Sequence, residues 1–449
     1  MTALVLLGPV VSQTVWAQST YSPPQFGNQT SNPGINAGRF ILYPAVSFNY
    51  AHDDNMFYQS DDLPGVEPVE SGRIEIVPRL LIDLPLSRSR VRLQYAPLFR
   101  DYLNHEVAQV NKWSHFFDFE ASILMADVFT VALRDHYVSG SQEVQEFDPG
   151  GEIRFNLAPF TLHEPSVEFS LDAGVRHRFS FIPRFSTLDF DEGPGQIFYD
   201  YKRRGYEGRY TFKVSPETQV FAYTISDYTQ QERIQTFYGD VDVDLRTTGI
   251  GLQRLAGGII TTGGSIGWEQ QDYTGGGGGD YAGIAADINV GLSPSDVMRF
   301  ELMFRRGAFQ SFYVNNNYYI NLEGRLRMLR QLGRSAFWQV ALTLAQNDYG
   351  DATDVTMTAN NVPSDDTDND GYIDLFESFL PSQGVVRRDQ AAAIDLSAGW
   401  RLRPTLRFLV GYNHQRRDSN VVQDIGGEFA ETADYTDNRV YVTLEMGFL

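Results

Sequence analysis

Hydrophobic and polar residues alternate with a period of two over long parts of the chain. From Val167 to Phe179, apolar residues occupy most odd positions, and polar or charged residues occupy most even positions. The same alternation is found at 299–305, 320–328 and 439–448. Successive side chains of a β-strand point to opposite faces, so this pattern predicts strands with one apolar face and one polar face.

About eighteen strands of this kind follow one another along the chain. The connections between them alternate between short turns, such as those predicted at 163–166 and 331–334, and long polar segments. The largest polar segments are 52–71, 350–384 and 418–438. The predicted strands begin near Ile41, Arg73, Arg90, Lys112, Val128, Glu152, Val167, Tyr201, Thr218, Val241, Ile259, Tyr281, Val297, Tyr318, Ala336, Arg387, Thr405 and Arg439.

The sorting of the connections separates two all-β classes. A soluble β-sandwich has no reason to alternate short and long connections, whereas outer-membrane barrels join strands by short periplasmic turns and long extracellular loops. No apolar stretch of about 18 residues follows Arg39, which excludes helical membrane spans. The sequence therefore predicts an all-β fold, a transmembrane antiparallel β-barrel of about 18 strands (~16 to 18), in the outer membrane of a Gram-negative bacterium.

The first residues predict secretion. An apolar run at 3–11 precedes Val15-Trp16-Ala17, which has the small-x-Ala form of a signal peptidase site. We interpret 1–17 as a signal peptide without its charged n-region, because Arg39 is the first basic residue. Residues 18–38 carry no charge and predict a flexible periplasmic lead-in, and 39–449 form the barrel. An even number of strands places both termini in the periplasm.

Composition and charge narrow the function classes. The chain has no Cys, which excludes disulfide scaffolds, thiolate zinc sites and thiol catalysis. Its formal charge of -21 argues against nucleic acid as a partner. The segments 52–71, 350–384 and 418–438 hold six, eight and six acidic residues and no Lys or Arg. The long loops should thus form an acidic outer rim, which divalent ions could bridge to lipopolysaccharide phosphates and which disfavours entry of anionic solutes.

The start of the predicted barrel carries a family resemblance. The segment 39–44 reads Arg-Phe-Ile-Leu-Tyr-Pro, and 50–57 reads Tyr-Ala-His-Asp-Asp-Asn-Met-Phe. These residues resemble the opening of a family of outer-membrane β-barrel porins associated with exopolysaccharide biosynthesis and secretion clusters. The resemblance implies a pore that exports exopolysaccharide or a related hydrated polymer. The last strand looks like the signal read by the barrel-assembly machinery, although Phe448 is penultimate instead of last.

One motif in the longest loop predicts a metal site. Residues 366–377 read Asp-Thr-Asp-Asn-Asp-Gly-Tyr-Ile-Asp-Leu-Phe-Glu, which fits the twelve-residue calcium loop. Gly371 permits the sharp turn, and the alternative is a solvated acidic loop. We expect a structural Ca²⁺ held by Asp366, Asp368, Asp370, the Tyr372 carbonyl, Asp374 through water, and Glu377.

Catalytic patterns are weak, and the sequence predicts no enzyme. Gly263-Gly264-Ser265-Ile266-Gly267 matches a nucleophile elbow, but it lies in a predicted strand and not at a strand-to-helix turn. The seven His residues have no metal-ligand spacing.

Function is expected in the lumen, where charges of both signs could guide a polar solute or could simply pair with each other. The predicted lumen-lining residues are Arg92, Arg176, Arg178, Arg299, Glu301, Arg305, Glu323, Arg325, Arg327 and Arg407. The predicted partners are outer-membrane lipid, lipopolysaccharide, and a polysaccharide or small polar solute. The alternatives to an exopolysaccharide export channel are a general small-solute porin, a barrel enzyme acting on lipid or polysaccharide, and an adhesive surface barrel.

Overall fold

The computed structural model describes residues 34–56, 58, 60, 68–104, 112–141, 159–190, 200–232, 240–254, 259–275, 279–311, 317–350, 386–420, 423–425, 428–430 and 434–447. Eighteen long strands within these ranges form one barrel, as the alternation predicts. They are β2 (Phe40–Asp53), β3 (Ser71–Pro85), β4 (Ser89–Tyr102), β5 (Trp113–Met125), β6 (Phe129–Gly140), β7 (Phe160–Ala173), β8 (His177–Phe190), β9 (Asp200–Lys213), β10 (Thr218–Glu232), β11 (Val241–Arg254), β12 (Ile260–Thr274), β13 (Tyr281–Ser295), β14 (Met298–Gln310), β15 (Tyr318–Leu332), β16 (Ala336–Tyr349), β17 (Arg388–Arg403), β18 (Leu406–Ser419) and β21 (Tyr435–Gly447).

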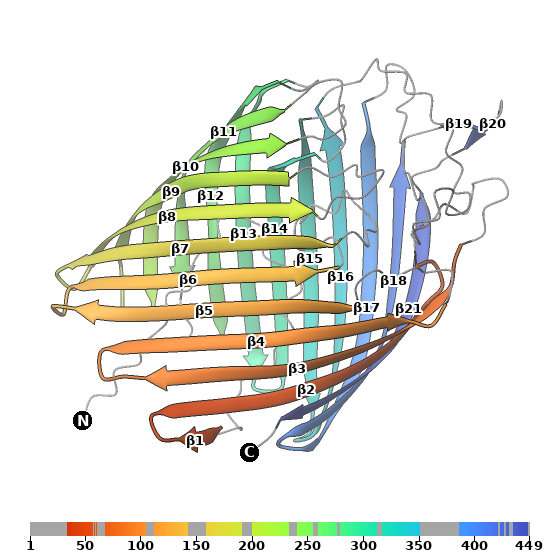
Figure 1. Ribbon diagram of the computed structural model, residues 1–449, viewed down its shortest axis with the longest axis horizontal. Helices are drawn as coiled ribbons and strands as arrows, with labels where there is room; N and C mark the ends of the chain where they lie inside the picture. Colours follow the sequence, from red (N-terminus) through yellow and green to blue (C-terminus); the bar gives the residue numbers. More distant parts are fainter. Residues whose placement is uncertain are drawn as a thin grey trace.

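The barrel closes between its first and last strands. Consecutive barrel strands pair antiparallel, from β2 with β3 to β18 with β21. β2 then pairs with β21 in a register that runs from Ala45 opposite Gly447 to Asp53 opposite Arg439, and we call this pair the seam. Figure 1 shows the strands as one continuous wall around an interior. Closure pairs the strand edges, which is the condition for β structure to cross hydrocarbon.

Three short strands accompany the eighteen barrel strands, and one of the three, β1 (Ile35–Ala37), extends the barrel sheet at the beginning of β2. β1 forms a hairpin with the beginning of β2 and lies within the segment 18–38 that the sequence predicts as a lead-in. Among the described residues, β19 (Gln423–Ile425) and β20 (Glu428–Ala430) pair only with each other. In the ranges that the structure describes, no helix has the length and the apolar character needed to span a membrane.

The two rims of the barrel differ as predicted. On one rim, β3 and β4 are joined through 86–88, β5 and β6 through 126–128, and β15 and β16 through 333–335. On the other rim, the chain takes long connections, the longest between Tyr349 and Arg388. We assign the rim of short turns to the periplasm and the rim of long connections to the cell exterior.

One predicted turn is wrong. The sequence predicts a turn at 163–166 and a strand from Val167 to Phe179, but β7 runs through Pro165 and the chain turns at 174–176 instead. Pro165 is accommodated because it faces Asp135 on β6, while Pro165 itself and Glu164 have no ladder partners on β8. Gly174 makes the turn, since its φ of 73° is a left-handed conformation that glycine adopts without strain.

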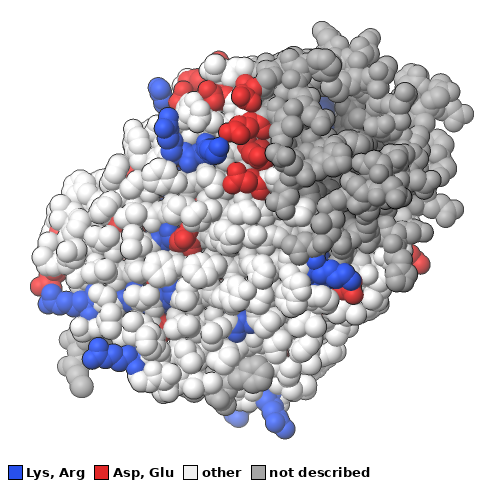
Figure 2. Space-filling model, in the orientation of Figure 1, with Lys and Arg blue, Asp and Glu red and all other residues white. Residues whose placement is uncertain are grey.

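The outward face is apolar and the inward face is polar. Outward side chains such as Phe48, Ile250 and Leu302 are exposed, whereas the inward Ser47 and Glu75 are buried. Near the periplasmic rim, the outward His177 at the beginning of β8 bonds to the Tyr210 hydroxyl at 2.8 Å. Figure 2 shows few charged side chains in the middle of the visible wall. A closed barrel with an apolar outside and aromatic groups near its rims is built for a bilayer, so the protein lies in the outer membrane.

Candidate functional site in the barrel lumen

The lumen is lined by alternate residues of every strand, and it divides into two halves along the barrel axis. Near the periplasmic turns, many inward side chains are charged and several of these are partly exposed, although Ser170, Phe221 and Glu445 are buried there. Near the extracellular ends of the strands, the inward side chains are buried. We call these regions the periplasmic half and the extracellular half of the lumen.

Arginines and acids of adjacent strands pair across the wall in the periplasmic half. Arg90 on β4 makes a two-point contact with Asp83 on β3, at 2.9 and 2.6 Å. Arg92 lies between two acids, 3.9 Å from Asp83 and 4.0 Å from Glu120 on β5. The side chains of Arg92 and Glu120 are each 41% exposed, so the pairs are in contact with water.

Similar groups continue around this half. Arg178 makes a two-point contact with Asp172 across the β7–β8 hairpin, with both distances 2.8 Å. Glu301 on β14 accepts from Arg299 at 2.8 Å and from Arg327 on β15 at 2.5 Å. Each acid therefore orients guanidinium groups while leaving them accessible to a passing solute.

The middle of the lumen contains a tighter pair and an arginine without one. Arg305 on β14 lies 2.8 Å from Glu323 on β15, and both side chains are largely shielded. Arg325 forms no ion pair with any described residue, and its Nε has no hydrogen-bond partner there. Nearer the periplasmic turns, beside the seam, Arg407 and Glu445 pair at 3.4 Å.

Nine of the ten predicted lumen residues lie at inward positions of strands, namely Arg92, Arg178, Arg299, Glu301, Arg305, Glu323, Arg325, Arg327 and Arg407. Arg176 does not lie at an inward position of a strand. It is exposed in the turn at 174–176, because β7 ends at Ala173, whereas the predicted strand runs to Phe179. The predicted calcium ligands at 366–377 lie outside the described residues. Ser265 lies within β12, so its Gly-rich surroundings form a strand and not a nucleophile elbow.

Buried ion pairs of the extracellular half were missed by sequence reasoning. Asp389 on β17 is held between Arg387, at 2.8 Å, and Arg417 on β18, and all three side chains are at most 5% exposed. Arg184 on β8 reaches Asp227 on β10 with a two-point contact at 3.2 and 3.0 Å. The acids compensate the buried guanidinium charges, which would otherwise be costly.

An apolar group was also missed. Inward-facing residues of β3 to β9 form one buried cluster near the extracellular ends, from Val77, Ala96, Leu98, Phe116, Val138, Phe160, Leu162, Leu188, Phe190 and Tyr201. Phe221, Tyr223 and Ile225 on β10 form a second inward group, which begins near the periplasmic turn at 214–217. A signal for the first cluster exists in the sequence, because the run Ala96-Pro97-Leu98-Phe99 is apolar on both faces of its strand.

Comparisons with solved structures return outer-membrane proteins at low identity. The chain is similar to the ferric citrate transporter FecA, with a TM-score of 0.44 and 10% identity over 90% of this chain and 78% of that chain. For the siderophore receptor PirA from Pseudomonas aeruginosa, the TM-score is 0.44 and the identity is 10%, over 91% of this chain and 80% of that chain. For the outer membrane protein OpdK from Pseudomonas aeruginosa, the TM-score is 0.40 and the identity is 11%, over 91% of this chain and 99% of that chain. No protein-family model and no curated protein matches the sequence, so the porin-family resemblance of its first strand stays a prediction.

Proposed function

We propose that the protein is an outer-membrane export channel for a hydrated polymer, with exopolysaccharide as its cargo. The observation that carries the proposal is a set of partly exposed charged pairs in the periplasmic half of the lumen, followed by a shielded extracellular half. Exposed groups of both signs, such as Arg92, Glu120, Arg299 and Glu301, offer many weak contacts to a polar chain. Weak, repeated binding is what conduction requires, and a polymer made inside the cell meets this half first.

The shielded half favours an exporter over an open diffusion porin. A barrel of ~16–18 strands leaves an aqueous channel unless something fills it, so an open pore keeps its inward side chains in water along its whole length. Here the inward Leu188, Tyr319 and Asp389 near the extracellular ends are buried. The acidic residues of 52–71 and 418–438 also disfavour anionic solutes that arrive from outside, without opposing exit.

A deletion strain of the source bacterium tests the cargo. We expect loss of the gene to remove exopolysaccharide from the cell surface while the polymer accumulates in the periplasm. The wild-type gene should restore export, and a variant with Arg92→Glu and Arg299→Glu should restore it poorly, because both changes leave acids facing acids in the lumen. Unchanged surface polymer in the deletion strain would overturn the proposal.

Reconstituted protein separates the export channel from the small-solute porin. In liposome-swelling measurements with graded sugars, we expect slow entry of mono- and disaccharides through the wild-type protein. Exposed charged pairs in the periplasmic half would suit small polar solutes as well, so rapid swelling with small sugars would favour a general porin. If deletion of the gene abolishes polymer export and the liposomes swell slowly with small sugars, the two results together support a channel dedicated to polymer export.

A further inference from the structure

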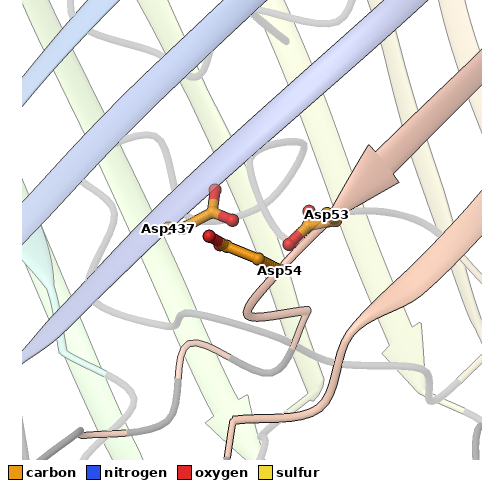
Figure 3. Close-up of side chains that lie close together, drawn as sticks. All are labelled: Asp53, Asp54 and Asp437. Carbon is orange, nitrogen blue, oxygen red and sulfur yellow. The ribbon is translucent and has the colours of Figure 1, made fainter.

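Three acidic side chains meet at the extracellular end of the seam. Asp53 is the last residue of β2, Asp54 follows it, and Asp437 lies near the beginning of β21. One carboxylate oxygen of each lies within 4.8 Å of the other two, and Figure 3 shows the three groups facing one another. The Asp54 N–H donates to the Asn438 carbonyl at 3.2 Å, so strand pairing holds the group in place.

Two of the acids are positioned by hydrogen bonds that leave lone pairs unused. Asp53 accepts from the Asn55 N–H at 3.1 Å and from Arg439 at 2.9 Å. Asp54 accepts from the N–H and the side-chain amide of Asn438, both at 2.7 Å. A carboxylate offers about four lone-pair positions, so each oxygen can still bind a cation. Ligating carboxylates in metal sites are commonly oriented by such outer hydrogen bonds.

Asp437 supplies an independent indication of a ligand. Its side chain is completely buried, and its Oδ2 accepts from Gln415 at 2.8 Å. Its Oδ1 is buried and accepts no hydrogen bond from any described N–H or hydroxyl donor, and the Asp53 carboxyl lies beside it. A buried carboxylate oxygen without a donor is costly, above all beside two further carboxylates. A positively charged species between the three groups removes this cost.

The charge balance identifies that species. Three carboxylates meet one paired guanidinium, that of Arg439, which leaves two negative charges in excess. A single shared proton would leave one negative charge, whereas a divalent cation balances both. Three carboxylate oxygens converge, and water can complete the six to eight oxygen ligands that Ca²⁺ takes in a flexible geometry, whereas Mg²⁺ demands a near-ideal octahedron. We propose that Asp53, Asp54 and Asp437 form a calcium site that ties the first strand of the barrel to the last.

This site assigns a role to the Asp-Asp-Asn sequence at 53–55 and is separate from the calcium loop predicted at 366–377. At its extracellular end, the seam depends on the pairing of β2 with β21 and on side-chain contacts such as Asp53 with Arg439. A cation bound by both strands adds a contact to the folded barrel that the unfolded chain cannot make. Calcium should therefore raise the temperature at which the barrel opens.

Calorimetric titration of the refolded full-length protein with CaCl₂ tests the proposal. The titration is made in the Glu377→Gln background, so that the predicted loop does not contribute a second site. We expect one site at 10⁻⁴–10⁻³ M, the range of about 0.1 to 1 mM typical of extracellular calcium modules. Adding Asp437→Asn should weaken it by about tenfold or more, as loss of a supporting or direct ligand does. The heat-induced mobility shift on SDS gels should move to higher temperature with Ca²⁺ only while Asp437 is present.

Asp418→Asn is the matched control, because it removes one acid from the same rim outside the cluster, where Asp418 pairs with Arg416. It should leave the isotherm unchanged. If Asp437→Asn does not fold, Asp54→Asn takes its place, since Asp54 is only partly buried. An absence of calcium binding by the folded Glu377→Gln protein, or equal isotherms with and without Asp437, would overturn the site and leave a shared proton as the occupant.

Discussion

The two halves of the lumen use the same residue types for different purposes. In the extracellular half, Asp389 and Arg417 are at most 4% exposed, and their pairing holds β17 against β18 in a shielded interior. In the periplasmic half, Arg299 is 52% exposed beside Glu301, and water screens the pair. An ion pair is costly to break where its charges are buried and contributes little where they are exposed. The extracellular half therefore provides structure, and the periplasmic half presents charge.

Removing the acid at the centre of the buried group should have the largest effect. Asp389→Asn leaves Arg387 and Arg417 buried without their counter-charge. We expect a loss of about 3–5 kcal/mol in the free energy of unfolding, the usual result of removing one partner of a buried pair. Urea unfolding of the protein folded in lipid vesicles measures this difference.

The neighbouring pair on the outside of the wall is the control for that experiment. Arg416 and Asp418 alternate with Arg417 along β18 and are exposed. Asp418→Asn should leave the unfolding midpoint unchanged, because solvent screens the pair. Equal losses for Asp389→Asn and Asp418→Asn would show that burial of the Asp389 ion pairs is not the cause of the effect.

A core truncation should have the second largest effect. Leu188→Ala removes a completely buried side chain from the inward apolar cluster of the extracellular half. We expect a loss of about 2–5 kcal/mol in the free energy of unfolding, because a cavity is left behind. Leu329→Ala, at a half-buried inward position of the periplasmic half, should cost less than half as much. A similar loss at both positions would show that the periplasmic half is also packed.

The outward face could be predicted from the sequence because a bilayer imposes one rule on every strand. Outward positions must be apolar, so alternation alone identified the number of strands and the inward side of residues such as Arg305 and Arg407. It failed at 163–179, where a proline inside β7 resembles a turn signal and the true turn depends on Gly174. Because the turn occupies three residues, the alternation continues across it, which concealed the end of the strand.

The buried contacts of the extracellular half follow no such rule. Arg184 and Asp227 are 43 residues apart and lie on strands that are not adjacent, so their contact depends on the strand register and the curvature of the wall. The acidic cluster of the seam joins residues from the two ends of the barrel and needs closure to exist. A pattern read along one strand carries no information about these pairings, although the apolar run at 96–99 signals that one stretch of inward wall is dry.

Neutralising an acid of the periplasmic half should have the smallest effect on stability and a clear effect on ion selectivity. Glu301→Gln removes the shared partner of Arg299 and Arg327. We expect a change below about 1 kcal/mol in the free energy of unfolding, because the pairs are partly exposed. The two guanidinium groups then face the lumen without compensation, and the reversal potential of planar bilayers under a salt gradient should shift toward anion selectivity.

A turn residue separates this effect from a general change in charge. Glu217 lies at the same rim, in the exposed turn at 214–217 and away from the lumen wall, so Glu217→Gln alters the net charge by the same amount. Its reversal potential should remain that of the wild type. If both variants shift selectivity equally, the field of the whole rim determines selectivity. If neither does, the charged pairs of the periplasmic half do not line the path of the ions, and the export channel loses the wall on which it depends.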